Sequence, residues 1–186
     1  MGTHGEDAVF AGGEALIRQA CAMSRLHWID LPAGGRMAIM ARPRADDWLD
    51  VEVAEWKACG LEVIVSLLEP EEVSDLGLQR EAALCRASGI EFLSFPIFDR
   101  GVPDIPDATK IADSIAAGIA DGRAIAIHCR AGIGRSSIVA ACAMICSGIE
   151  AGDALSRIKA ARGVNVPDTE EQRDWIFAFG KTYRRS

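Results

Sequence analysis

Short apolar runs alternate with amphipathic segments along most of the chain. The apolar runs predict strands over residues 25–31, 36–40, 61–67, 90–97 and 123–128. The amphipathic segments predict helices over residues 47–59, 70–87, 107–120, 136–147, 151–161 and 168–183. The runs 61–67 and 123–128 are rich in aliphatic residues throughout, which is typical of strands buried on both faces.

This alternation predicts an α/β fold. We expect three layers, with a central, mainly parallel sheet of about five strands flanked by helices. The segment 136–147 is apolar on all sides, which predicts a helix buried in the middle of the fold. The chain has 186 residues, no internal repeat and no long linker, which favours a single domain over residues 25–186. Residues 1–24, rich in glycine at first, are expected to form an N-terminal appendage, partly mobile.

The composition limits the kinds of partner that we expect for this chain. With 20 Lys and Arg against 27 Asp and Glu, the net charge is −7, which argues against nucleic-acid binding. No run approaches the 18 apolar residues of a membrane span, and the start shows no signal peptide, so we expect no membrane partner. The six cysteines form no C-x-x-C pair and are expected to be reduced thiols in a cytoplasmic protein.

The candidate chemistry lies between the strand 123–128 and the helix 136–147, where residues 128–136 read HCRAGIGRS. A turn between a buried strand and a buried helix points successive backbone N–H groups inward, at the positive end of the helix dipole. Such a loop binds a phosphate dianion even in an acidic protein. Gly132 and Gly134 let the backbone approach the phosphate oxygens.

Three side chains of this loop fit nucleophilic chemistry. The field that holds phosphate also favours the thiolate of Cys129, while the guanidinium of Arg135 matches two phosphate oxygens. Ser136 can donate a hydrogen bond to the sulfur. A lone buried cysteine is more often a packing residue, but here the whole string fits its structural context.

The H-C-x5-R-S string, with Ala-Gly-x-Gly before the arginine, resembles the signature of cysteine-based phosphatases. The resemblance extends over about residues 36–179, to small bacterial enzymes of the dual-specificity and protein-tyrosine type. It implies hydrolysis of phosphomonoesters through a phosphocysteine intermediate, with no cofactor and no metal. It also implies a site for phosphate or other oxyanions. The loop residues that would bind the phosphate are Arg130, Ala131, Gly132, Ile133, Gly134 and Arg135.

The resemblance implies further site residues. The general acid of the family follows the preceding strand, and Phe-Pro-Ile-Phe-Asp at 95–99 matches, so Asp99 is the expected acid and Asp104 the alternative. Gln172 matches the glutamine that positions the hydrolytic water, but it equally completes a capping box with Thr169. His128 is expected to support the loop rather than act as a base.

Three functions remain open. The first is removal of phosphate from phosphotyrosine in proteins or peptides, with phosphoserine and phosphothreonine as further candidate substrates. The second is hydrolysis of an inositol phosphate or phosphoinositide. Related phosphoinositide enzymes often carry lysine within the loop, whereas here Arg130 is the one basic residue between Cys129 and Arg135, which favours a singly phosphorylated substrate. The third, a catalytically inactive phosphate-binding module, is disfavoured because nucleophile, arginine and acid candidate are all present.

Overall fold

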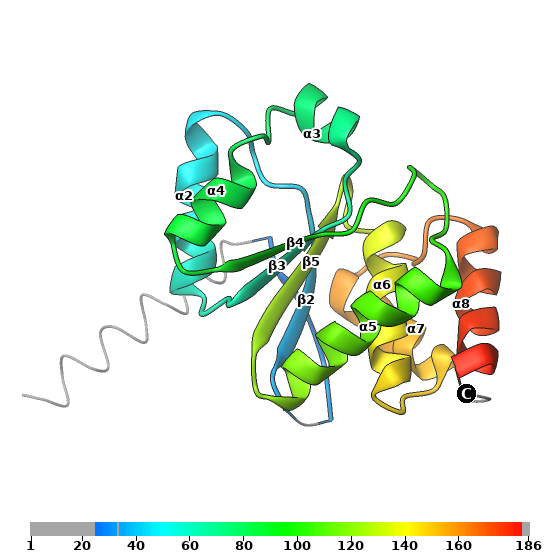
Figure 1. Ribbon diagram of the computed structural model, residues 1–186. Coiled ribbons are helices and arrows are strands. Elements are labelled where there is room, and N and C mark those ends of the chain that lie inside the picture. The colour runs from blue at the N-terminus through cyan, green and yellow to red at the C-terminus, as the bar shows by residue number, and fades with distance from the viewer. Residues whose placement is uncertain (1–24, 33, 184–186) are drawn as a thin grey trace, which may run out of the picture.

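The sheet has the predicted architecture. The computed structural model describes residues 25–32 and 34–183. Its five strands are β1 (His27–Ile29), β2 (Arg36–Ala41), β3 (Val63–Ser66), β4 (Glu91–Ser94) and β5 (Ala124–Cys129). They form one sheet in the order β1-β2-β5-β3-β4, in which β1 is antiparallel to β2 and the other pairs are parallel (Figure 1). The predicted α/β fold is therefore confirmed.

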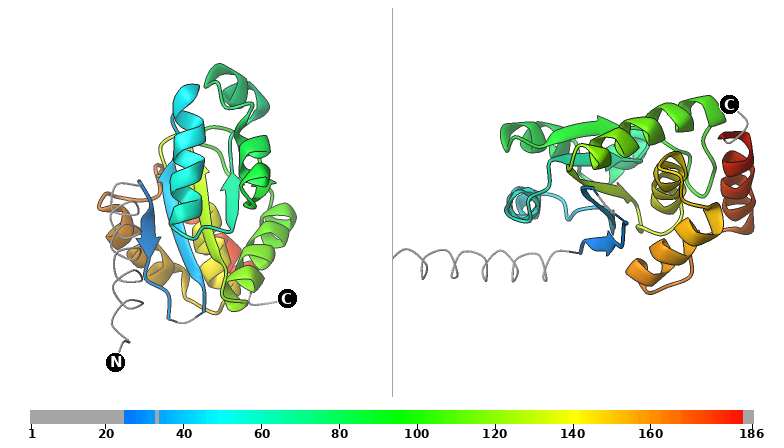
Figure 2. Two further views of the ribbon diagram at one scale, coloured as in Figure 1. Left: turned by 90° about the vertical axis from the view of Figure 1, so that its left-hand side faces the viewer. Right: turned by 90° about the horizontal axis from the view of Figure 1, so that it is seen from below.

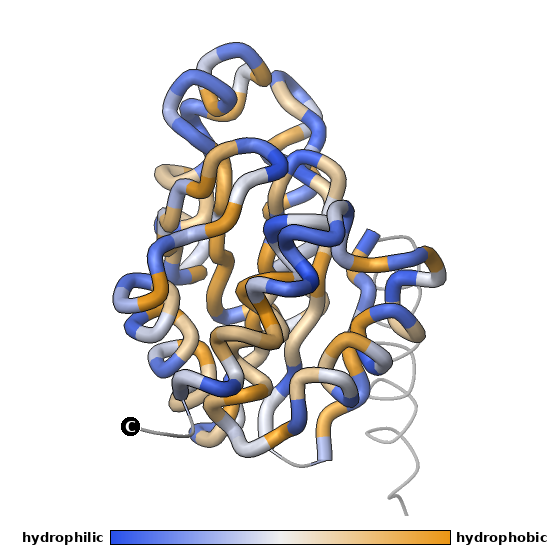
Figure 3. Tube along the Cα trace, turned by 90° about the vertical axis from the view of Figure 1, so that its right-hand side faces the viewer, coloured by the Kyte–Doolittle hydropathy of each residue, from blue (hydrophilic) through white to orange (hydrophobic). Residues whose placement is uncertain are grey.

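Helices cover both faces of this sheet. One face carries α2 (Asp47–Ala58) and α4 (Glu81–Ala87), which lie in front of the strands in the left panel of Figure 2. The other face carries α5 (Ile105–Ala120), α6 (Arg135–Cys146), α7 (Ala151–Arg162) and α8 (Glu170–Tyr183). Each layer encloses its own hydrophobic core. Figure 3 looks onto the second layer, where hydrophilic and hydrophobic stretches alternate along the chain.

The centre of the fold is the β5–α6 unit. All six residues of β5 are buried, and β5 lies between β2 and β3, as expected for a strand read from an unbroken apolar run. Helix α6 is buried along eleven of its twelve residues, from Arg135 to Ile145. The loop over residues 129–135 therefore lies at the carboxyl end of the central strand, the edge at which open α/β sheets place their ligands.

Two sequence predictions were wrong in detail. Residues 70–87 form two short helices, α3 (Pro70–Asp75) and α4, rather than one. The break falls at Gly77, whose φ of 67° is left-handed and ends the helical hydrogen bonding. The cysteines also differ from expectation: Cys85, Cys129, Cys142 and Cys146 are free, but Cys59 is disulfide-bonded. Sequence spacing does not show which thiols a fold brings together.

The predicted N-terminal appendage, residues 1–24, lies outside the described residues. Within residues 25–32 and 34–183, no helix is both long and apolar enough to cross a membrane.

Candidate active site

The 129–135 loop wraps around the sulfur of Cys129. The backbone N–H of Gly132 donates to Cys129 Sγ at 3.3 Å. Gly132 has a φ of 68°, and a Cβ there would lie 2.4 Å from the carbonyl carbon of Met40. At Gly134 a Cβ would meet Gln172 Oε1 at 2.8 Å. Gly132 is therefore required by its backbone conformation and by its close approach to β2, whereas a side chain at Gly134 would displace the amide of Gln172.

An arginine from a distant helix holds the loop from outside. Arg162, at the end of α7, donates from Nε to the carbonyl of Gly132 at 3.0 Å and from Nη2 to that of Ala131 at 3.2 Å. A peptide unit whose carbonyl points away from the pocket has its N–H on the opposite side. The contacts of Arg162 thus stabilise the orientation that turns loop N–H groups toward an anion.

The nucleophile candidate has the neighbours that the sequence predicts. Cys129 is 3% exposed, and its Sγ lies 3.6 Å from Ser136 Oγ, close enough for the hydroxyl to donate to a thiolate. His128 is fully buried on the other side of the sheet, and its Nε2 lies 3.0 Å from Glu81 Oε1. The two atoms are within ion-pair distance, but their geometry is not that of a hydrogen bond. The pair joins β5 to α4.

Arg135 is clamped by a carboxylate from α3. Its Nη1 and Nη2 donate to the two carboxylate oxygens of Glu72 at 2.5 and 2.9 Å, a bidentate pair. Nη1 also donates to the carbonyls of Leu67 and Ile97, at 3.4 and 3.0 Å. Arg135 is only 2% exposed, so these contacts fix the guanidinium plane firmly. Arg130, by contrast, is largely exposed, with Nη1 3.9 Å from Glu72.

The ion pair between Arg135 and Glu72 shifts the pKa of both groups. The hydrogen bond from Arg135 is the main reason that the pKa of Glu72 is lowered, and it outweighs burial, which acts the other way. Burial alone would lower the pKa of Arg135, but Glu72 and the other negative groups around it raise the pKa instead. Both groups are therefore held in their charged forms.

Asp99 reaches this site and Asp104 does not. Asp99 Oδ1 lies 3.0 Å from Arg135 Nη2, and its side chain is 52% exposed, so it stands at the mouth of the pocket. Asp104 is the N-cap residue of α5 and does not line the pocket. Of the two candidates raised by the sequence, the geometry thus favours Asp99.

Gln172 connects α8 to the loop that carries Asp99. Its amide Nε2 donates to the carbonyl of Gly101 at 3.1 Å, and its Oε1 accepts from the backbone N–H of Asp168 at 3.1 Å. Its own backbone N–H donates to Thr169 Oγ1, which is one half of the predicted capping box. The other half is absent, because the side chain reaches Asp168 instead. Gln172 lines the pocket while also ordering the start of α8.

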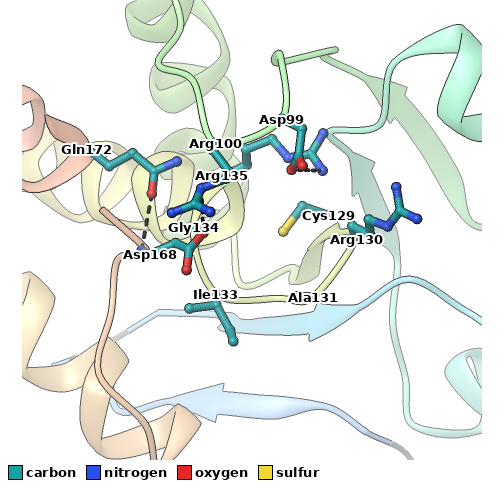
Figure 4. Close-up of a pocket in the computed structure, with 10 residues that line it drawn as sticks. All are labelled: Asp99, Arg100, Cys129, Arg130, Ala131, Ile133, Gly134, Arg135, Asp168 and Gln172. Carbon is teal, nitrogen blue, oxygen red and sulfur yellow. Dashed lines mark hydrogen bonds and ion pairs between the residues drawn. The ribbon is translucent and has the colours of Figure 1, made fainter. Parts of the chain in front are cut away.

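These groups converge on one pocket of about 180 Å³ (Figure 4). It is lined by Asp99, Arg100, Cys129, Arg130, Ala131, Ile133, Gly134, Arg135, Asp168 and Gln172. Figure 4 shows the Cys129 sulfur on the floor with Asp99 and Arg135 together beside it, whereas Arg130 points away. Arg100 and Asp168 pair across the rim at 3.6 Å. Within the described ranges, no cluster of three or more His, Cys, Asp or Glu side chains is arranged to hold a metal ion.

Comparison with known proteins identifies the family. The family model described as Cyclin-dependent kinase inhibitor 3 (CDKN3) matches residues 42–156, which is more than half of the chain. The chain belongs to the CDKN3 family. Human Cyclin-dependent kinase inhibitor 3 is 28% identical over 130 residues, 69% of this chain and 61% of the human one. This chain thus spans less than two thirds of the length of the curated CDKN3 relatives.

Solved structures share the fold. The kinase associated phosphatase, with its catalytic site cysteine replaced by serine, superposes with a TM-score of 0.79 at 23% identity and covers 87% of this chain and 96% of that one. Tk-PTP in its active form gives a TM-score of 0.69 at 26% identity, over 86% and 98%. PTPMT1 in complex with PI(5)P gives 0.65 at 19%, over 81% and 94%. The CDKN3-family chain has the fold of dual-specificity and tyrosine phosphatases.

Four residues of the site were missed from the sequence: Glu72, Arg162 and the rim pair of Arg100 and Asp168. Glu72 lies 63 positions before Arg135, and Arg162 lies 30 positions after Gly132. Glu72 sits in an acidic stretch with Glu69 and Glu71, and nothing in the pattern marks it out. Both contacts are set by where α3 and α7 pack, so no local motif indicates them.

Proposed function

We propose that this chain is a cysteine-dependent phosphatase, which hydrolyses phosphotyrosine foremost, and also phosphoserine and phosphothreonine, in proteins. The observation that carries the proposal is the convergence of Cys129, Arg135 and Asp99 on one small pocket. Membership of the CDKN3 family and the phosphatase fold support it. The proposal includes no cofactor, as the sequence predicts. The cytoplasmic location also stays a prediction, and the disulfide at Cys59 removes one of its two grounds, the reduced thiols.

In the first step, the thiolate of Cys129 attacks phosphorus. The S–P bond forms as the bond between phosphorus and the leaving oxygen breaks, and Asp99 transfers its proton to that oxygen. The N–H groups of the 129–135 loop and the guanidinium of Arg135 take up the charge of the equatorial oxygens. Because Glu72 holds the guanidinium in place, this stabilisation needs no reorganisation during the reaction.

The Arg135–Asp99 contact explains how substrate binding would prepare Asp99 for the first step. Nη1 is committed to Glu72, Leu67 and Ile97. Among the described residues, none accepts a hydrogen bond from Nε, so the edge of Arg135 formed by Nε and Nη2 is the one offered to phosphate. A substrate phosphate would take Nη2 from Asp99 and so release the carboxyl group for the leaving oxygen.

In the second step, water attacks the phosphocysteine. The O–P bond forms, the S–P bond breaks, and the water proton passes to Asp99. Ser136 donates to the departing thiolate from 3.6 Å. Gln172 Nε2 keeps a second N–H besides the one given to Gly101, which is available to orient the water.

A substrate panel tests this function. Phosphotyrosine, phosphoserine and phosphothreonine peptides are compared with inositol phosphates and a phosphoinositide, with and without EDTA. We expect kcat/KM for the phosphotyrosine peptide to be about tenfold or more above that for the inositol compounds, since Arg130 is the one basic residue added within the loop. EDTA should leave the rates unchanged and vanadate should inhibit. A preference for the inositol compounds would show that the proposed substrate class is wrong. Loss of activity on chelation would show that the proposed metal-independent mechanism is wrong.

A further inference from the structure

The turn that carries Asp99 holds a second charged residue at the mouth of the active-site pocket. The backbone N–H of Gly101 donates to the carbonyl of Phe98 at 2.9 Å and closes a four-residue turn. Arg100, the third residue of this turn, has a left-handed φ of 60°. Glycine usually takes that position, because a side chain there costs conformational energy. An arginine held in this conformation beside a pocket points to a role for its side chain.

The position of Arg100 is fixed by the packing of its turn. Gln172 Nε2, on α8, donates to the carbonyl of Gly101 at 3.1 Å and so anchors the turn. The side chain of Arg100 lines the pocket and is 68% exposed, which places it at the rim. Figure 4 shows Arg100 and Asp168 together on one side of the pocket, and Arg130 on the other. A substrate that enters the pocket therefore passes beside Arg100.

The guanidinium of Arg100 has only a loose partner. Its Nε lies 3.6 Å from Asp168 Oδ2, which is longer than a hydrogen bond, and the Asp168 side chain is itself 45% exposed. Across residues 25–32 and 34–183, no hydrogen bond from this guanidinium is formed. The buried guanidinium of Arg135 is instead held by several acceptors. Arg100 thus keeps a fork of donors that matches a carboxylate.

We propose that Arg100 determines substrate specificity by binding an acidic side chain, Asp or Glu, next to the phosphotyrosine of a substrate peptide. This inference rests on the proposed function. With the phosphate held at Arg135, the residues that flank phosphotyrosine lie over the rim. The acidic side chain then replaces Asp168 as the partner of Arg100. Because the chain carries a net charge of −7, this attraction comes from the local contact and not from the overall charge.

Matched peptides test the preference. Three peptides carry a non-hydrolysable difluorophosphonate in place of the phosphate of phosphotyrosine, flanked on both sides by Glu, Gln or Lys. Calorimetry with the full chain at low salt should show the Glu peptide binding about three- to fivefold more tightly than the Gln peptide, and the Lys peptide most weakly. Salt at about 0.5 M should reduce the difference.

Turnover of the corresponding phosphotyrosine peptides, measured in parallel, keeps the two claims apart. The ratio of binding affinities tests the role of Arg100, whereas hydrolysis of the Gln peptide tests the proposed function. Hydrolysis without a preference for Glu would overturn this inference alone. A preference for Glu without hydrolysis would support the inference and contradict the proposed function.

Variants locate the contact. Arg100→Gly removes the guanidinium and suits the left-handed turn, so the Glu peptide should bind no better than the Gln peptide. The control is Arg80→Ala, which removes an arginine that is 61% exposed and does not line the pocket, and the preference should remain. Asp168→Asn removes the competing carboxylate and should increase the preference about twofold. A preference that survives Arg100→Gly, or that falls in Asp168→Asn, would overturn the proposal.

Discussion

Two regions at the carboxyl ends of the parallel strands differ in how their polar groups are satisfied. Around the 129–135 loop the protein supplies its own partners: Gly132 N–H for the sulfur, Glu72 for Arg135. On the other face of the sheet, Glu81 Oε1 forms an ion pair with His128 Nε2 at 3.0 Å, and Ser66 Oγ has no hydrogen bond. The first region is thus preorganised to hold charge, whereas the second leaves a buried hydroxyl without a partner. The predictions below break individual contacts of the preorganised region.

The largest effect is expected from Cys129→Ser. A serine hydroxyl in the loop stays protonated and is a poor nucleophile, so kcat with a phosphotyrosine peptide should fall by roughly 10³-fold or more. Binding of a phosphate analogue should remain, because the N–H groups and Arg135 are unchanged. Cys146→Ser, at the far end of α6, is the matched control and should leave kcat near wild type. Retained turnover in a metal-free preparation of Cys129→Ser would show that Cys129 is not the nucleophile.

Asp99→Asn should have the next largest effect. A general acid contributes about 10²–10⁴-fold, and its loss matters most for leaving groups that need a proton. The loss of kcat should therefore be large with phosphotyrosine and shrink with aryl phosphates of low leaving-group pKa. The control is Asp104→Asn, which changes the N-cap of α5 and should show no such dependence. A steep dependence for Asp104→Asn, with Asp99→Asn near wild type, would reverse the assignment.

The sequence predicted those parts of the site that are local along the chain. Cys129, Arg135, Ser136 and the loop glycines form one contiguous string, and the apolar runs around it predicted the central strand and helix. Glu72 and Arg162 could not be predicted, because each acts from a separate helix whose packing decides the contact. The break at Gly77 was missed for a related reason: a single glycine within a helical pattern is often tolerated.

Glu72→Gln tests the clamp on Arg135. In Gln an NH2 donor replaces one of the two acceptor oxygens that the guanidinium uses, so the bidentate pair is lost, Arg135 loses its fixed orientation and kcat/KM should fall about 10- to 100-fold. Glu71→Gln changes the exposed neighbour on α3 and should be close to wild type. Activity of Glu72→Gln equal to that of Glu71→Gln would mean that the clamp does not orient Arg135 for the reaction.

The stability difference between wild type and Glu72→Gln should depend on pH. Because the pKa of Glu72 is lowered in the folded chain, its stabilising effect is fully present above the ordinary value of 4.5 and is lost as pH falls through the lowered value. The difference in unfolding free energy between wild type and Glu72→Gln should therefore be constant near neutral pH and shrink below about pH 4. Denaturant unfolding at a series of pH values measures it. A difference that grows toward acid pH would contradict the assigned sign.

Arg162→Ala should have the smallest effect. It removes two hydrogen bonds to the outer carbonyls of the loop, from a partly exposed position, so affinity for phosphate should fall about three- to tenfold. The control is Lys159→Ala, an exposed residue of the same helix that makes no contact with the loop among the bonds described. Phosphate affinity measured by calorimetry decides the matter. Unchanged affinity in Arg162→Ala would show that the loop keeps its shape without this support.

The central claim is that phosphate passes through Cys129. A single-turnover reaction of the wild-type chain with a phosphotyrosine peptide, stopped in acid within the first turnover and mapped by mass spectrometry, tests it directly. The proposed mechanism predicts one added phosphoryl group on the peptide that contains Cys129, and none in Cys129→Ser. Complete turnover with no adduct at any sampled time, or a phosphoryl group on another residue, would contradict the mechanism.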